Sequence, residues 1–364
     1  MASRTRRPMR VSLLALLLTF ILPFAFVIYQ LVNEINQRIE FTQSARYGCQ
    51  YLQPLEQLLR DVPESQRIAN RYFSKAANLA TLQQQQQQVE QDMQAVVQVQ
   101  QQWGDRLKTA QEFQALQQNW QHLNLELSRQ SSQPNFSTTQ TAIVEDLHTK
   151  LIAKVQDLIS QVGNTSNLIL DSDLDSYYLM DAILLKLPEV QELLGSLRLL
   201  GEDMIRQELT PEEREQLIAQ MGVVQSDSDA IRKGMNVAFD HHPSRTLEAI
   251  LQAPLHDSVS ATQIFLNLLD QALSQAATAP VPLPAAEFDR TAVAALQASS
   301  NLWQAIVKQL DGLLQSRIER FRQKTYQVEA FALLVFTAVS YVFIAFSYNL
   351  LLQRRAARRL SAQH

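Results

Sequence analysis

The residues with the clearest chemical potential lie in one short segment, where three aspartates alternate with other residues ahead of a tyrosine pair. This segment reads DSDLDSYYLMD and spans Asp171 to Asp181. Carboxylates at alternate positions open calcium loops of the EF-hand type, but such a loop has glycine at its sixth position and glutamate at its twelfth. Ser176 and Ala182 stand at those positions. We therefore expect no metal site here.

Two interpretations of this segment remain open. In the first, acidic and serine side chains satisfy the exposed N–H groups at a helix start, and the tyrosines pack between helices. In the second, the junction lines a ligand pocket. The candidate ligand-binding residues of the segment are Asp171, Asp173, Asp175, Tyr177, Tyr178 and Asp181.

Arg198 completes the set of candidates, because it stands in a stretch that is otherwise rich in leucine. A partly buried guanidinium can bind a carboxylate ligand through two parallel hydrogen bonds. It can equally form a salt bridge with an acid of a neighbouring helix. His241 and His242 could bind a metal, but adjacent histidines before a proline are more typical of a plain turn.

The sequence predicts no catalytic residues, no cofactor and no enzyme activity. The single cysteine, Cys49, excludes an intrachain disulfide framework and a zinc site built from cysteines. No Ser-His-Asp order and no glycine-rich phosphate-binding pattern occurs.

Composition and periodicity predict that these candidates stand on helices. Only 8 of 364 residues are glycine, and leucine, alanine, glutamine and glutamate are abundant. Apolar residues recur at steps of three or four from Ile143 to Ile169, and a heptad-like seam runs from Val293 to Phe321. We expect a glutamine-rich helix over 83–102, a break near Gly104 and a helix end at Pro63. We also expect a capping box at Thr210.

Two long apolar segments predict membrane-spanning helices, at 11–32 and 329–352, and the runs 11–32 and 331–352 carry no charge. Arginines flank them at 4–10 and 354–359, so the tails 1–10 and 353–364 are expected in the cytoplasm. The region 33–328 is then extracytoplasmic. The predicted fold is all-α: an elongated up-and-down helical bundle between two transmembrane helices, with two stacked bundles as an alternative.

The charge of the external region also excludes one class of partner. Without the eight arginines of the two flanks, 24 basic residues face 36 acidic ones, a formal charge of −12. Such a surface does not attract nucleic acid.

The segment from Leu168 to Gly201, LILDSDLDSYYLMDAILLKLPEVQELLGSLRLLG, resembles a segment found in the extracytoplasmic sensing regions of bacterial transmembrane receptors. These receptors are chemoreceptors and sensor histidine kinases, in which a HAMP domain and an output module usually follow. Ser172 stands where that segment often has proline. The tail 353–364 is too short for a HAMP domain, so we expect either that the signalling output belongs to a separate protein or that this chain is a partial or degenerate receptor.

The resemblance implies a sensory receptor module in a bacterial inner membrane, of the kind used in chemotaxis and two-component systems. Its expected partners are the lipid bilayer, a small solute or a solute-binding protein, and a second copy in a homodimer. A different class remains an alternative: an envelope adaptor that holds partner proteins through its bundle.

Overall fold

The computed structural model describes residues 8–131, 138–170, 173–206, 209–242, 245–276 and 284–360. These residues form helices and short connections, with no strand among them, so the all-α prediction is confirmed. Asp171 lies outside the described residues. Two compact units divide the chain: residues 43–315 form one, and residues 1–42 with 316–364 form the other. Helices α1 (Pro8–Phe73) and α9 (Ala285–Leu360) contribute to both.

The smaller unit contains the candidate membrane span. Helix α9 is the one helix of the described chain that is long and apolar enough to cross a membrane, by length and composition. An 18-residue window of it has a mean hydropathy of 2.2 and is only 6% buried. In the same unit, the rings of Phe24 in α1 and Phe336 in α9 meet edge to face, with centroids 5.4 Å apart. Helix α1 covers the predicted span 11–32, which stays a prediction.

Within the larger unit, α1 packs with the next three helices. They are α2 (Leu79–Leu107), α3 (Ala110–Ser131) and α4 (Thr138–Thr165). The glutamine-rich stretch is helical within α2, whose few apolar residues, among them Val89, Met93 and Val96, are buried. The break expected near Gly104 occurs at Lys108, which adopts the left-handed conformation and donates its N–H to the Gly104 carbonyl.

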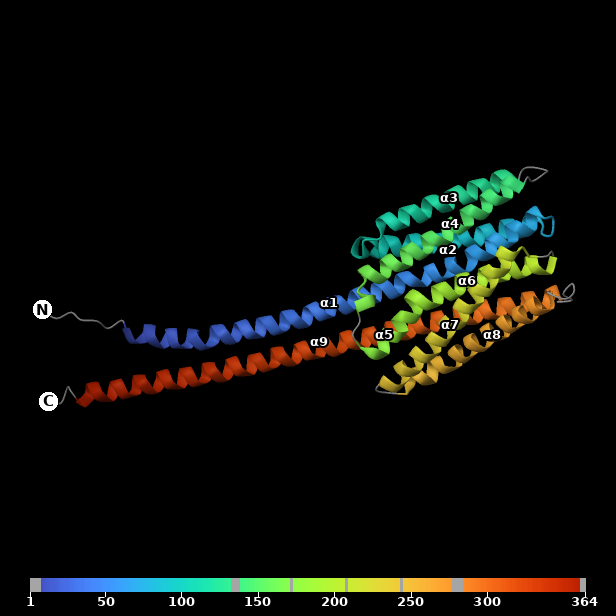
Figure 1. Ribbon diagram of the computed structural model, residues 1–364. Helices are drawn as coiled ribbons and strands as arrows, with labels where there is room; N and C mark the ends of the chain where they lie inside the picture. Colours follow the sequence, from blue (N-terminus) through green and yellow to red (C-terminus); the bar gives the residue numbers. More distant parts are fainter. Residues whose placement is uncertain are drawn as a thin grey trace. The chain divides into compact units, whose positions relative to one another are not determined.

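The remaining helices form a second group in the same unit. In chain order they are a 3₁₀ turn η1 (Leu168–Leu170), α5 (Leu174–Asp181), a π-helical turn η2 (Ala182–Lys186), α6 (Leu187–Arg206), α7 (Pro211–His241), α8 (Thr246–Ala276) and α9. Figure 1 shows α2, α3 and α4 on one side of the C-terminal part of α1, and α6, α7 and α8 on the other. The capping box predicted at Thr210 is present at the start of α7.

The two groups share one stretch of α1. The Tyr51 hydroxyl donates to a glutamine of α2 at 2.6 Å, and Ser65 bonds to His148 of α4. Between these positions, Glu56 accepts a hydrogen bond from Ser300 of α9. The groups therefore lie beside one another along α1, which corrects the alternative of two bundles stacked end to end.

One further sequence prediction, the helix end at Pro63, is wrong. Pro63 does not end its helix, because α1 continues to Phe73. A proline inside a helix removes one backbone hydrogen bond and usually kinks or breaks it. Here Gly195 of α6 packs against the Pro63 ring, where a Cβ would lie 3.0 Å away. The seam on α9 belongs to the intrachain core, since Ser300, Trp303 and Val307 are buried within a single chain.

Candidate functional site

The aspartates of the predicted site stand at the start of α5, and Asp175 ties it to the end of α7. Asp173 precedes the first residue of α5, and its backbone carbonyl accepts the Tyr177 N–H at 2.8 Å. The Asp175 carboxylate accepts the Ser176 N–H at 2.8 Å through Oδ1. Its Oδ2 lies 2.9 Å from Nδ1 of His242, the C-terminal cap of α7. Both side chains are mostly buried, so the histidine closes its helix and also anchors the aspartate segment.

The two tyrosines have different surroundings. Their rings meet edge to face with centroids 5.2 Å apart. Tyr178 packs against Gly234 of α7, where a Cβ would come within 2.7 Å of the ring. Tyr177 is 42% exposed. The expected packing between helices thus holds for Tyr178, while Tyr177 presents a phenol at the surface.

Asp181 lies at the π-helical turn, in an acidic cluster around one lysine. Lys186 of η2 donates to Asp227 of α7 at 2.9 Å, and Asp227 is 5% exposed. Burial raises the pKa of Asp181, and the neighbouring Asp227 raises it further. Burial and Asp227 likewise raise the pKa of Glu189. The ion pair of Lys186 and Asp227 is not predictable from the sequence, because two residues 41 positions apart leave no local pattern.

Arg198 lies at the centre of an ionic network that joins three helices. Its guanidinium donates to Asp289 of α9, at 3.1 and 2.5 Å, and to Glu64 of α1 at 2.8 Å. Arg67 of α1 binds Glu64 with two hydrogen bonds, of 2.8 and 2.6 Å, and Glu202 of α6 with one of 3.1 Å. Arg198 is 5% exposed. Its geometry is that of the interhelical salt bridge, one of the two roles that the sequence left open.

The structure does not bring the predicted residues together into one site. Asp181 and Arg198 are separated by η2 and by about three turns of α6. At a rise of 1.5 Å per residue, they lie roughly 25 Å apart along the helix. The segment from Asp173 to Asp181 instead forms the contact between α5 and the C-terminal half of α7. Arg198 lies further along the chain, past the middle of α6.

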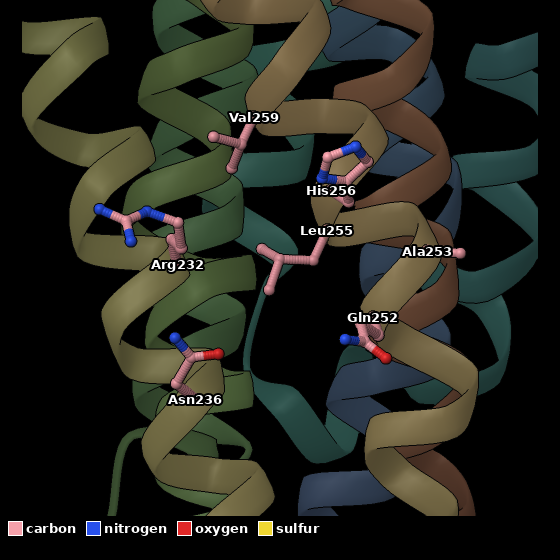
Figure 2. Close-up of a pocket in the computed structure, with 7 residues that line it drawn as sticks. All are labelled: Arg232, Asn236, Gln252, Ala253, Leu255, His256 and Val259. Carbon is pink, nitrogen blue, oxygen red and sulfur yellow. The ribbon is translucent and has the colours of Figure 1, made fainter.

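A groove of about 480 Å³ lies between α7 and α8. Figure 2 shows Arg232 and Asn236 on α7, and Gln252, Leu255 and His256 on the neighbouring α8. Leu255 is buried at its floor, and the polar side chains stand at the exposed rim. These groups can hydrogen-bond a polar ligand, but none of them is a buried charge that would fix its orientation.

One side-chain pair has the geometry of an activated hydroxyl. His148 of α4 bonds to the Ser65 hydroxyl through Nε2 at 3.1 Å and to the Val144 carbonyl through Nδ1 at 2.8 Å. Because a carbonyl only accepts, Nδ1 carries the proton and Nε2 accepts from Ser65. Both residues are completely buried, so the pair joins α1 to α4 and no solute in solution can reach it.

Within the described ranges, no group of three or more His, Cys, Asp or Glu side chains is placed to hold a metal ion. Comparisons with family models, with curated proteins and with solved structures each give no match to this chain. The function must therefore be inferred from the geometry of the helices and from their charged side chains.

Proposed function

We propose that this chain is a membrane-anchored sensory receptor module. Its helical unit 43–315 binds a solute, or a protein that carries a solute, and α9 transmits the resulting displacement across the membrane. We place it in a bacterial inner membrane, with both termini in the cytoplasm and residues 33–328 outside. The module passes its signal to a partner protein and acts as a homodimer.

One observation carries the proposal: a single helix contains both the core seam of the helical unit and the candidate span. Trp303, Ile306 and Leu310 of α9 are buried in that unit. Further along the same helix, Leu334, Tyr341 and Ile344 are large, apolar and exposed, as lipid-facing side chains are. A ligand that favours one packing of α9 over another would shift the population of states, and a continuous helix passes such a shift along its length.

Disulfide cross-linking between α1 and α9 tests the transmission. Phe24→Cys and Phe336→Cys replace two rings that are in contact, in a chain whose Cys49 is changed to Ser. Phe26→Cys with Phe336→Cys is the offset control, because the Phe26 side chain is 59% exposed. Compounds that raise the melting temperature are first selected from amino acids, carboxylates and sugars, since a ligand of the native state stabilises it.

A selected compound should change the cross-linking rate of the Phe24/Phe336 pair relative to the offset pair. Binding with unchanged rates would contradict transmission through these helices. If no compound binds and an envelope protein co-purifies with the chain, the adaptor function replaces the proposed one.

A further inference from the structure

A second cavity, of about 270 Å³, lies where the end of α1, the last turns of α6 and the first turn of α9 meet. Its volume is close to the lower end of the range for small-molecule sites. The lining combines charged residues with an apolar wall. The charged lining residues are Arg71, Glu202 and Asp289, and the apolar wall includes Ile205, Ala286 and Phe288.

One side of the cavity is lined by two carboxylates, Glu202 and Asp289. Glu202 and Asp289 belong to the ionic network of Arg67 and Arg198, in which three carboxylates face two guanidinium groups. Arg198 binds only Oδ1 of Asp289, and Oδ2 makes no hydrogen bond with a described residue. The two acids are therefore held in position by arginines, while a carboxylate oxygen remains available to a cation in the cavity.

Arg71 supplies the opposite charge. Its guanidinium has no hydrogen bond or ion pair with any residue that the structure describes, in contrast to Arg67 one turn earlier. Its backbone is fixed, because the carbonyl of Arg71 accepts the N–H groups of Ala76 and Ala77 at 2.7 and 3.0 Å. A guanidinium on a fixed backbone, with no acid bound to it among the described residues, is suited to a carboxylate that comes from solution.

A ligand that carries both a positive and a negative charge matches both charged sides of the cavity. A simple carboxylate would bring an anion beside Glu202 and Asp289, and a simple amine would leave Arg71 unpaired; either ligand satisfies only half of the cavity. The wall formed by Ile205 and Phe288, the latter 1% exposed, favours an apolar substituent.

We propose that this cavity binds the zwitterion of an α-amino acid with an apolar side chain. Arg71 binds the carboxylate, Asp289 and Glu202 bind the ammonium group, and the side chain contacts Ile205 and Phe288. The proposal rests on the proposed function, because it names the ligand class of that sensor. The carboxylate-binding role considered for Arg198 thus belongs to Arg71.

Isothermal titration of the full chain in nanodiscs tests the site, with L-alanine, L-leucine and L-phenylalanine as probes. At least one should bind. Isovalerate and isoamylamine, which each keep one charge of leucine, should bind at least roughly tenfold more weakly than leucine. Arg71→Gln should weaken binding of the best amino acid by at least roughly tenfold, without lowering the melting temperature of the free protein. Arg290→Gln is the matched control, since Arg290 is exposed on the same turn region of α9 and does not line the cavity.

The proposal is overturned if none of the three amino acids binds, if Arg71→Gln binds as tightly as the parent, or if isovalerate matches leucine. These outcomes are separable from those of the cross-linking experiment. An amino acid that binds through Arg71 but leaves the Phe24/Phe336 rate unchanged supports the site and contradicts transmission. A different compound that changes the rate, with no amino acid bound, supports sensing and overturns this site.

Discussion

His148 is held as a neutral imidazole by complete burial between α4 and α1. Burial lowers its pKa to about 4, because the charged form loses its hydration. An unfolded chain has the ordinary histidine pKa of about 6.5. As the pH falls below that value, the unfolded state gains a proton that the native state does not take up until about pH 4. Native stability is thus lost progressively over this range, by about 2 kcal/mol at pH 5.

Replacing His148 by glutamine should therefore flatten the acid side of the stability profile. The measurement is the melting temperature of the full chain at pH 7.5 and pH 5. We expect a smaller drop between the two in His148→Gln than in the parent. His256→Gln, at an exposed position of α8, should leave the drop unchanged. An equal drop in the His148 variant would contradict the assignment.

Asp92 should show the opposite dependence. It lies 4% exposed on α2, facing Asp61 of α1. Burial raises its pKa to about 7, and the neighbouring carboxyl group of Asp61 adds to the effect. A raised carboxyl pKa means that the native state holds a proton that the unfolded state releases, so this site stabilises the fold as the pH falls from about 7 toward 4.

The variant Asp92→Asn mimics the protonated form, so it should raise the melting temperature at pH 8.5 and have little effect at pH 5. Asp105→Asn, at an exposed position of the same helix, serves as the control at both pH values. A loss of stability at pH 8.5 would show that the charged carboxylate stabilises the native state, so that its pKa is not raised.

The site residues illustrate what sequence can predict at this scale. For the acids around Tyr177 the sequence leaves a helix start and a ligand pocket open, and the structure places Asp173 and Asp175 at the start of α5. The partners of Arg198 could not be assigned. Glu64 and Asp289 lie 134 and 91 residues away, and the register between packed helices is set by side-chain packing, which spacing along the chain does not encode.

Helix ends were predictable where a local motif defines them. The capping box at Thr210 uses only the residues from 210 to 213, and it is present. The helix end predicted at Pro63 is wrong, because whether a proline ends a helix depends on what packs against it. The π-helical turn before Pro188 is not predictable, because its wide hydrogen-bond pattern has no sequence signature.

Close packing of α6 also makes one glycine essential. A Cβ on Gly201 would lie 2.3 Å from Cζ of the buried Phe288 and 3.1 Å from Cδ2 of Leu269. Gly201→Ala should therefore lower stability by about 1–3 kcal/mol, as overpacking of a core does. Gly222→Ala on α7 is the matched control, because nothing lies within 4 Å of the added Cβ.

The Gly222→Ala variant should raise stability by about 0.5–1 kcal/mol, because alanine has a better helix propensity than glycine. Thermal unfolding of the two variants beside the parent checks both signs. A Gly201→Ala protein as stable as the parent would mean that α6, α8 and α9 separate at little cost.

For the whole molecule, membrane integration depends on the exposed apolar part of α9. Leu334→Arg combined with Val342→Arg places two charges within the candidate span, at a cost of about 2.5–3.5 kcal/mol each near the bilayer centre. The variant should be extracted from membranes by alkaline carbonate more readily than the parent. Leu125→Arg, at an exposed position of α3, should not change extraction. If the double variant resists extraction as the parent does, α9 does not span the membrane.

The sharing of α1 by two helix groups has a consequence for how this protein can be divided. Tyr51 and Ser65 face one group and Glu56 the other, so each group lacks a wall when the other is removed. Neither half is a module that could be excised or transplanted by itself. The larger unit should melt in one cooperative transition, and a chimera that exchanges sensing regions would have to carry residues 43–315 together.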